Sequence, residues 1–182
     1  ALAHRVLGEV LGRRRPLDDA LAEAFAAVDA VEPIDRRARA FARLLVATVL
    51  RRLGQIDAAL IQFLDRPLPA QAADAWTAMR LGAAQLLYLG TPPHAAVDGA
   101  VSMVADQSSY RGLVNAVLRK LAREGAGPLG NEDRQHLATP EWLWTSWVAA
   151  YGEAQARDIV EVHWREPPLD LTIKEDVPYW AA

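Results

Sequence analysis

The sequence contains no cysteine, which excludes disulfide bonds, thiolate catalysis and cysteine-based zinc sites from its 182 residues. It also lacks a long apolar run. The longest, residues 44–50, includes a threonine and is far shorter than the roughly 20 residues that span a bilayer. No apolar segment followed by a cleavage site marks the N-terminus for secretion. We therefore expect a cytoplasmic protein that makes no membrane contact.

Sequence signatures of catalysis are missing as well. There is no Gly-x-Ser-x-Gly, no phosphate-binding loop and no Gly-x-Gly-x-x-Gly, and no glycine cluster follows a strand pattern. The four histidines lack the i, i+3 or i, i+4 spacing of metal ligands; they are His4, His94, His136 and His163. The sequence predicts no catalytic residue, no metal site and no cofactor within this chain, which we expect to be non-catalytic by itself.

What the chain does contain is a globular composition, with 52% hydrophobic and 24% charged residues. Through residue 124, apolar residues recur at helical spacing and nowhere alternate with period two. Asp35 is placed as an N-cap, and Pro92 and Pro93 suit a first helical turn. We predict an all-α bundle with helices near residues 2–11, 17–31, 36–53, 54–64, 70–89, from 92 onward, and 110–124.

A glycine-rich connector at residues 125–130 predicts a boundary between a helical domain, 1–124, and a second segment, 125–182. Two linker helices are expected in that segment. Thr139 would cap the first, which carries several tryptophans, and the second would cover residues 154–164.

Near the C-terminus, Leu169, Leu171 and Ile173 alternate with polar residues, which predicts at most one isolated strand. A lone strand lacks hydrogen-bonding partners. Since the chain also starts at alanine, we expect a piece of a longer protein.

Charge is distributed unevenly along the chain. Residues 1–123 carry a net +4 and residues 124–182 a net −7, and the basic residues comprise 18 arginines and only 2 lysines. Arginine binds phosphate through two parallel hydrogen bonds and stacks on bases, which suits RNA. A GC-rich genome would also enrich arginine everywhere, so the positions of the arginines decide between these interpretations.

Four arginines of the third predicted helix fall within an arc of about 120°, facing away from the side that we predict to be inward, formed by Ala38, Phe41, Leu45 and Val49. We call these four the arginine stripe: Arg36, Arg39, Arg43 and Arg51. A solvated helix face usually mixes signs, whereas a stripe of one sign is typical of a polyanion-binding surface.

Two further basic clusters follow the first helix and end the seventh. A helix dipole also favours cations at a C-terminus, so the second cluster is weak evidence alone. The predicted RNA-binding residues are Arg13, Arg14, Arg15, Arg36, Arg39, Arg43, Arg51, Arg119 and Lys120.

Two segments, Leu-Leu-Tyr-Leu-Gly-Thr-Pro-Pro-His-Ala-Ala-Val-Asp at 86–98 and Gly-Leu-Val-Asn-Ala-Val-Leu-Arg-Lys at 112–120, resemble the NusB-like RNA-binding domain. Thr-Pro-Glu-Trp-Leu at 139–143 and Glu-Pro-Pro-Leu-Asp-Leu-Thr-Ile at 166–173 are similar to the linker of the RsmB (Sun/Fmu) family of bacterial 16S ribosomal RNA cytosine-5 methyltransferases. The resemblance implies an all-α domain that binds small-subunit ribosomal RNA, followed by a helical linker.

The resemblance also implies a methyltransferase domain that uses S-adenosylmethionine. The nucleophilic cysteine and glycine-rich loop of that domain have no counterpart in this sequence, so we expect the catalytic domain to be a missing partner of the chain and the chain to be a monomer. The linker departs from the family at His163, in His-Trp-Arg-Glu, where asparagine is more usual. Within the resemblance, Asn115 is expected to be a buried residue that satisfies backbone groups.

Two alternatives remain open. A free-standing NusB-type antitermination factor would bind RNA and a ribosomal protein, but it would end near residue 124. A helical adaptor without an RNA role would have helix faces of mixed sign.

Overall fold

The structure of the chain, a computed structural model, describes residues 2–105, 108–127, 136–165 and 167–168. Every regular element in those ranges is a helix, which confirms the all-α prediction. In chain order they are α1 (Leu2–Arg13), α2 (Leu17–Asp29), α3 (Arg36–Arg51), α4 (Leu53–Ile61), the 3-10 helix η1 (Ala70–Ala72), α5 (Ala73–Leu87), α6 (Pro93–Ser102), α7 (Arg111–Glu124), α9 (Glu141–Tyr151) and α10 (Glu153–His163). The strand predicted near residues 169–173 lies outside the described ranges.

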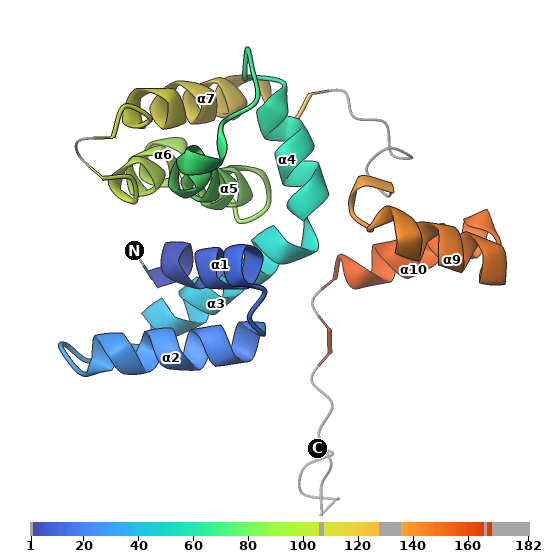
Figure 1. Cartoon of the computed structure of the whole chain (residues 1–182), viewed down its shortest axis with the longest axis horizontal. Helices are drawn as coiled ribbons and strands as arrows, with labels where there is room; N and C mark the ends of the chain where they lie inside the picture. Colours follow the sequence, from blue (N-terminus) through green and yellow to red (C-terminus); the bar gives the residue numbers. More distant parts are fainter. Residues whose placement is uncertain (1, 106–107, 128–135, 166, 169–182) are drawn as a thin grey trace, which may run out of the picture.

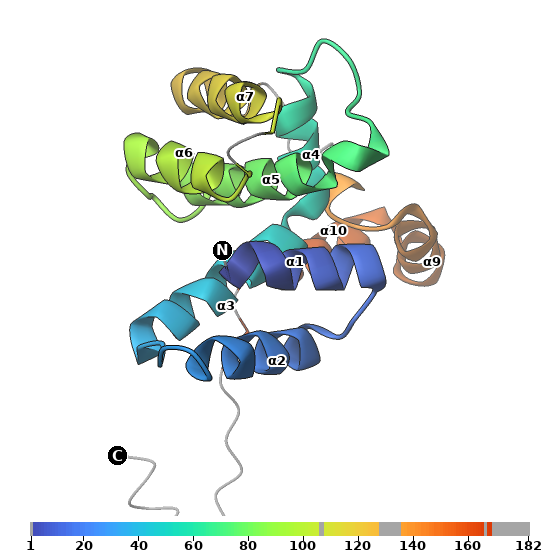
Figure 2. The same cartoon turned by 60° about the vertical axis from the view of Figure 1, so that its left-hand side comes forward.

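Helix α5 is at the centre of the bundle. It packs against α1 and α3 on one side and against α4, α6 and α7 on the other (Figures 1 and 2). Small residues make up much of its buried surface, which allows neighbouring helices to approach closely. These residues are Ala75, Ala78, Gly82, Ala83 and Ala84.

A single apolar cluster joins α1 through α7. Its largest fully buried side chains come from six helices: Leu7, Leu21, Leu45, Ile56, Leu60, Met79, Leu81, Leu118 and Leu121. Burying one such side chain contributes about 1.5–3 kcal/mol. The helical periodicity of the sequence therefore reflects a real core, and this core fixes the orientation of each helix.

The inward face of α3 was predicted only in part. Leu45 and Val49 are buried as expected, but Ala38 is exposed and Phe41 keeps 45% of its surface accessible. The buried residues of α3 begin at Ala42, because its first turns extend beyond the core. Periodicity along one helix cannot show where its neighbours end.

Helix starts were predicted with mixed success. The Asp35 carboxylate accepts a hydrogen bond from the Ala38 backbone N–H at 2.6 Å, which confirms this N-cap. Helix α6 begins with proline in its first turn, as expected. The prediction for Thr139 was wrong, since Pro140 occupies the N-cap of α9 without a side-chain capping bond. A proline at that position can supply only its carbonyl, which accepts from the Leu143 N–H at 2.9 Å.

Helices α9 and α10 pack against each other and form what we call the C-terminal hairpin. Gly152 connects them with φ +82°, a backbone conformation that side chains rarely adopt. The hairpin lies to one side of the bundle, beside the junction of α3 and α4 (Figure 1). The segment before it approaches closely there: a Cβ added at Gly54 would lie 1.7 Å from the carbonyl oxygen of Leu137.

The closest packing of α5 against α6 and α7 occurs at Gly82, where an added Cβ would lie 2.5 Å from Leu118 Cδ1 and 3.0 Å from Ala100 Cβ. We expect Gly82→Ala to reduce the free energy of unfolding by about 1–3 kcal/mol through overpacking. Gly8 is the matched control, because it is helical, exposed and has nothing within 4 Å of the added atom. Gly8→Ala should stabilise the fold by about 0.4–1 kcal/mol. Denaturant unfolding measures both, and parental stability of Gly82→Ala would contradict the packing.

Candidate nucleic-acid interface

The structure places the predicted RNA-binding residues in three regions of the molecule. The cluster after α1 and most of the arginine stripe lie on the side formed by α1, α2 and α3. Arg119 and Lys120 belong to α7, at the opposite end of the bundle (Figure 1). Arg51, the last residue of α3, lies beside the C-terminal hairpin. The nine residues therefore do not form one continuous surface.

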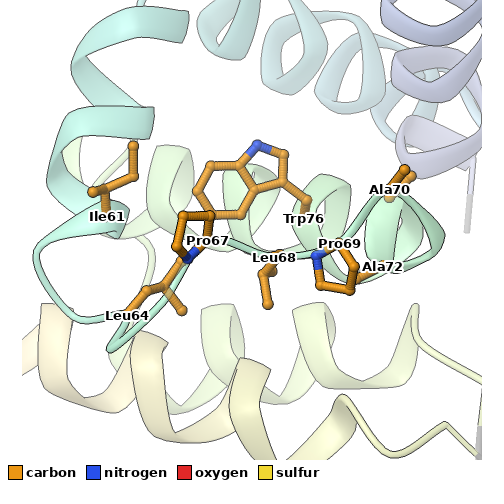
Figure 3. Close-up of a pocket in the computed structure, with 9 residues that line it drawn as sticks. Ile61, Leu64, Pro67, Leu68, Pro69, Ala70, Ala72 and Trp76 are labelled. Carbon is orange, nitrogen blue, oxygen red and sulfur yellow. The ribbon is translucent and has the colours of Figure 1, made fainter.

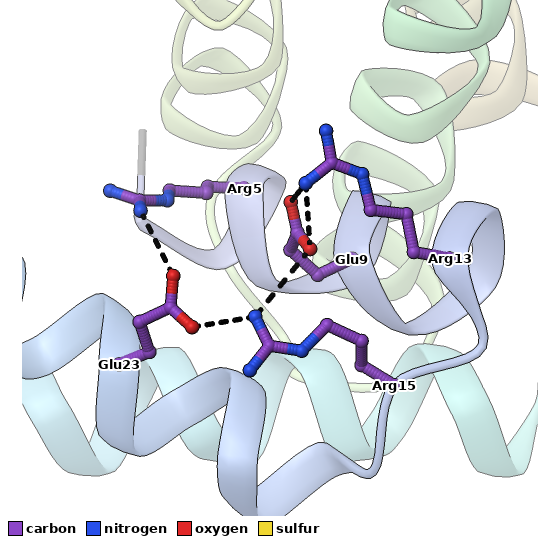
Figure 4. A network of polar contacts seen from close by, with 5 residues as sticks. All are labelled: Arg5, Glu9, Arg13, Arg15 and Glu23. Carbon is purple, nitrogen blue, oxygen red and sulfur yellow. Dashed lines mark hydrogen bonds and ion pairs between the residues drawn. The ribbon is translucent and has the colours of Figure 1, made fainter.

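Two residues of the first predicted cluster, Arg13 at the end of α1 and Arg15 in the loop after it, form ion pairs with acidic residues of α1 and α2 (Figure 4). Arg13 Nη1 donates to both carboxylate oxygens of Glu9, at 2.9 and 3.2 Å. Arg15 Nη1 donates to Glu23 at 2.6 Å and lies 3.7 Å from Glu9. Its hydrogen bond to Glu23 raises the pKa of Arg15 and lowers that of Glu23. Arg15 thus connects α1 to α2, whereas the Arg13–Glu9 pair lies within α1.

Acidic residues of α2 also pair with the arginine stripe. Arg43 Nη1 donates to Asp18 at 2.8 Å. Arg39 pairs with Asp29, and its guanidinium lies 5.2 Å from the ring centroid of Phe25. The prediction that the stripe is a surface of one sign was wrong at Arg39 and Arg43. The opposing carboxylates lie on another helix, where the periodicity of α3 gives no information about them.

Only part of the predicted set lacks such pairing. Within the described ranges, Arg14 and Arg36 are exposed and have no acidic partner. Arg119 donates from Nε to Asn115 Oδ1 at 2.9 Å, and Lys120 lies 5.8 Å from the ring centroid of Phe63. Asn115 is half-buried and positions Arg119, so the expectation that it is buried and satisfies backbone groups was wrong.

An important arginine was absent from the predicted set. The guanidinium of Arg52 lies 5.0 Å from the ring centroid of Tyr88 and 4.6 Å from that of Trp164, so it joins the bundle to the C-terminal hairpin. Its Nη1 donates to Gln55 Oε1 at 3.2 Å. Burial lowers the pKa of Arg52. The interaction with Tyr88 raises this pKa, but by less. The sequence signals were only the Arg-Arg doublet ending α3 and an aromatic residue after α10.

A second arginine outside the predicted set has a structural role. Arg80 of α5 makes two hydrogen bonds to Asp57 of α4, at 2.8 and 2.7 Å, and lies over the Trp76 ring. Charge-assisted pairs of this two-pronged geometry are among the stronger polar contacts in proteins. This pair holds α4 on α5.

An apolar pocket of about 340 Å³ lies next to that pair (Figure 3). Within the described part of the chain, no charged side chain lines it. The lining residues are Ile61, Leu64, Pro67, Leu68, Pro69, Ala70, Ala72, Ala73 and Trp76. It can accept apolar groups, but it offers no residues for catalysis.

The residues that the structure describes contain no group of three or more histidine, aspartate or glutamate side chains placed to hold a metal ion. No helix in the described ranges is long and apolar enough to cross a membrane.

Comparison with known proteins gives consistent results. The profile of the NusB family matches residues 1–123. A protein of Sodalis glossinidius named ribosomal RNA small subunit methyltransferase B is 32% identical over 147 residues, 78% of this chain and 33% of its own length. Proteins of the same name are 35% identical in Xanthomonas campestris pv. campestris, covering 94% of this chain and 37% of the relative, and 34% identical in Pasteurella multocida, covering 70% and 29%. The chain spans about a third of the length of these relatives.

The pairing of Asp29 predicts a pH-dependent contribution to stability. The Ile34 backbone N–H, which donates to Oδ1 at 3.1 Å, lowers the pKa of Asp29, and Arg39 lowers it further. Because the folded-state pKa is below the unfolded one, the stabilisation is present above about pH 3.9 and is lost as pH falls through the folded pKa. We expect Asp29→Asn to be less stable than the parent at pH 7, by a difference that shrinks towards pH 3.

Denaturant unfolding at pH 7, 5 and 3 measures that difference. Asp65→Asn is the control, because Asp65 is exposed and has no ion pair in the described ranges; it should match the parent at pH 7. A deficit of Asp29→Asn that stays constant across the three pH values would contradict the assignment.

Proposed function

We propose, since the chain belongs to the NusB family, that it is the RNA-binding region of a small-subunit ribosomal RNA cytosine-5 methyltransferase. The observation that carries the proposal is the extent of the similarity. The match to the Xanthomonas campestris protein runs over 173 residues, so it includes residues beyond the NusB family match. A free-standing antitermination factor has less support, because its similarity would end near residue 124.

In this proposal, methyl transfer and its cofactor, S-adenosylmethionine, belong to the part of the relatives that this chain does not match. That part makes up about two thirds of their length. The present sequence has neither a cysteine that could attack a base nor a glycine-rich loop that could hold the cofactor. The residues of this chain bind and position the RNA.

We propose that RNA phosphates bind first to the arginines that lack acidic partners. Arg14 and Arg36 on the α1–α3 side offer free guanidinium groups, which match phosphate geometry. Paired arginines such as Arg43 can also contribute, because an exposed ion pair is worth only about 0–1 kcal/mol and a polyanion can displace the carboxylate. Small-subunit ribosomal RNA is the proposed partner because the relatives are named for it.

The test replaces Arg14 and Arg36 together by glutamine and measures binding to ribosomal RNA fragments at several salt concentrations. Each phosphate contact contributes about 0.7 to the slope of log affinity against log salt for single strands. We expect affinity to fall for all RNA sequences and the slope to decrease by roughly 1.4. Arg66→Gln is the control and should bind like the parent, because Arg66, in the loop before η1, is equally exposed and has no acidic partner in the described ranges.

The double variant Arg39→Gln/Arg43→Gln provides a contrast. We expect a smaller change in slope, because Asp29 and Asp18 already neutralise these charges. It should also lose stability, since Arg39 contacts Phe25. If Arg14→Gln/Arg36→Gln keeps the affinity and salt slope of the parent, the α1–α3 side is not the RNA surface.

A further inference from the structure

A second pocket lies where the bundle meets the C-terminal hairpin. It is formed by the C-terminal end of α3, the C-terminal end of α10 and the residues that follow α10, and it measures about 510 Å³. Its lining combines basic groups with an apolar wall: Arg51, Val162, His163, Arg165, Pro167 and Pro168. Of these, only Arg51 belongs to the predicted RNA-binding residues.

Within the described residues, the basic groups of this pocket have no acidic partner, unlike Arg39 and Arg43 of the arginine stripe. Neither Arg51 nor Arg165 has an acidic partner in the described ranges, and none of the described lining residues is acidic. Two guanidinium groups that line one pocket repel each other, and a bound anion would remove that repulsion. The dipoles of α3 and α10 favour cations at Arg51 and His163, but Arg165 lies beyond the end of α10.

The contacts that hold the hairpin on the bundle also create this pocket. Arg52, next to Arg51 in sequence, carries the cation–π contact to Trp164, and Trp164 lies between His163 and Arg165. One interaction therefore brings basic side chains more than 100 residues apart in sequence to the same pocket. Close approach of Leu137 to Gly54 provides a second point of attachment.

The volume and lining indicate the kind of ligand. Pockets that hold small molecules measure about 300–1,000 Å³, so this one accommodates more than a bare phosphate ion. Guanidinium groups recognise phosphate oxygens, and Val162 and Pro168 offer apolar surface to a sugar or a base. In helical projection, Arg51 shares its face of α3 with Arg36, so an RNA strand lying along that face would reach the pocket.

We propose that this pocket binds one nucleotide of the RNA, with its phosphate on Arg51 and Arg165. The proposal rests on the RNA-binding function proposed above, and it makes the C-terminal hairpin part of the RNA site. Arg52 and Trp164 are positioning residues, because they act by holding the hairpin against α3.

The experiment measures two ligands on the full chain, cytidine 5′-monophosphate by calorimetry and a ribosomal RNA fragment by anisotropy. We expect Arg51→Gln/Arg165→Gln to lose roughly tenfold or more in affinity for both, because two charge-assisted contacts are removed. Arg66→Gln, which removes the same kind of charge elsewhere, should match the parent for both ligands. Far-UV circular dichroism and the unfolding midpoint check that every variant is folded.

Gly54→Ala tests the positioning role without changing a pocket residue. Its Cβ would displace the Leu137 carbonyl and with it the hairpin, so nucleotide affinity should fall while the fold of the bundle persists. Parental nucleotide affinity in Gly54→Ala would overturn the role of the hairpin.

Other outcomes separate the pocket from the proposed function. If the parent binds RNA and Arg51→Gln/Arg165→Gln binds it equally well, the pocket proposal fails and the RNA-binding function stands. If the parent binds the mononucleotide but no RNA at all, the proposed function fails, and with it the assignment of the pocket to RNA.

Discussion

Burial of most of α5 is the constraint on which the rest of the structure depends. Nine of its residues are buried, and Gly82 lets Leu118 of α7 and Ala100 of α6 approach its backbone. The part of α5 that reaches a pocket, Ala73 and Trp76, lines an apolar one, and Arg80 of α5 is paired with Asp57. The predicted RNA-binding residues lie on α1, α3 and α7 and in the loop after α1.

The arginines of this chain have several physical roles. Some, such as Arg80, hold helices together through two-pronged ion pairs. Others, such as the half-buried Arg15 and the exposed Arg43, are paired with carboxylates of α2, so they contribute little net field in the free protein but can exchange partners at low cost. A third group, which includes Arg36, has no acidic partner in the described ranges. An arginine-rich composition is therefore not equivalent to an arginine-rich binding surface.

The α3–α4 junction holds the C-terminal hairpin against the bundle. Arg52 is partly buried between two aromatic rings, where desolvation opposes its charge and the ring electrons compensate. The indole N–H of Trp164 is buried there with no hydrogen-bond partner in the described part of the chain, a cost that the stacking must also offset. Since this contact sets where the hairpin lies, a substitution at Arg52 or Gly54 would change the position of the hairpin relative to α3.

The sequence by itself determined the helical class, the helix positions to within a few residues, the Asp35 cap and the proline start of α6, because these depend on local periodicity and local hydrogen bonds. The segments at 86–98 and 112–120 also indicated the NusB family, which the match over residues 1–123 confirms. Only the tertiary structure decided which side chains neutralise one another and which surfaces remain open. Arg43 meets Asp18 across 25 positions, and Arg52 meets Trp164 across more than 100. Such pairings follow from how helices pack, and neither the periodicity of one helix nor its net charge contains that information.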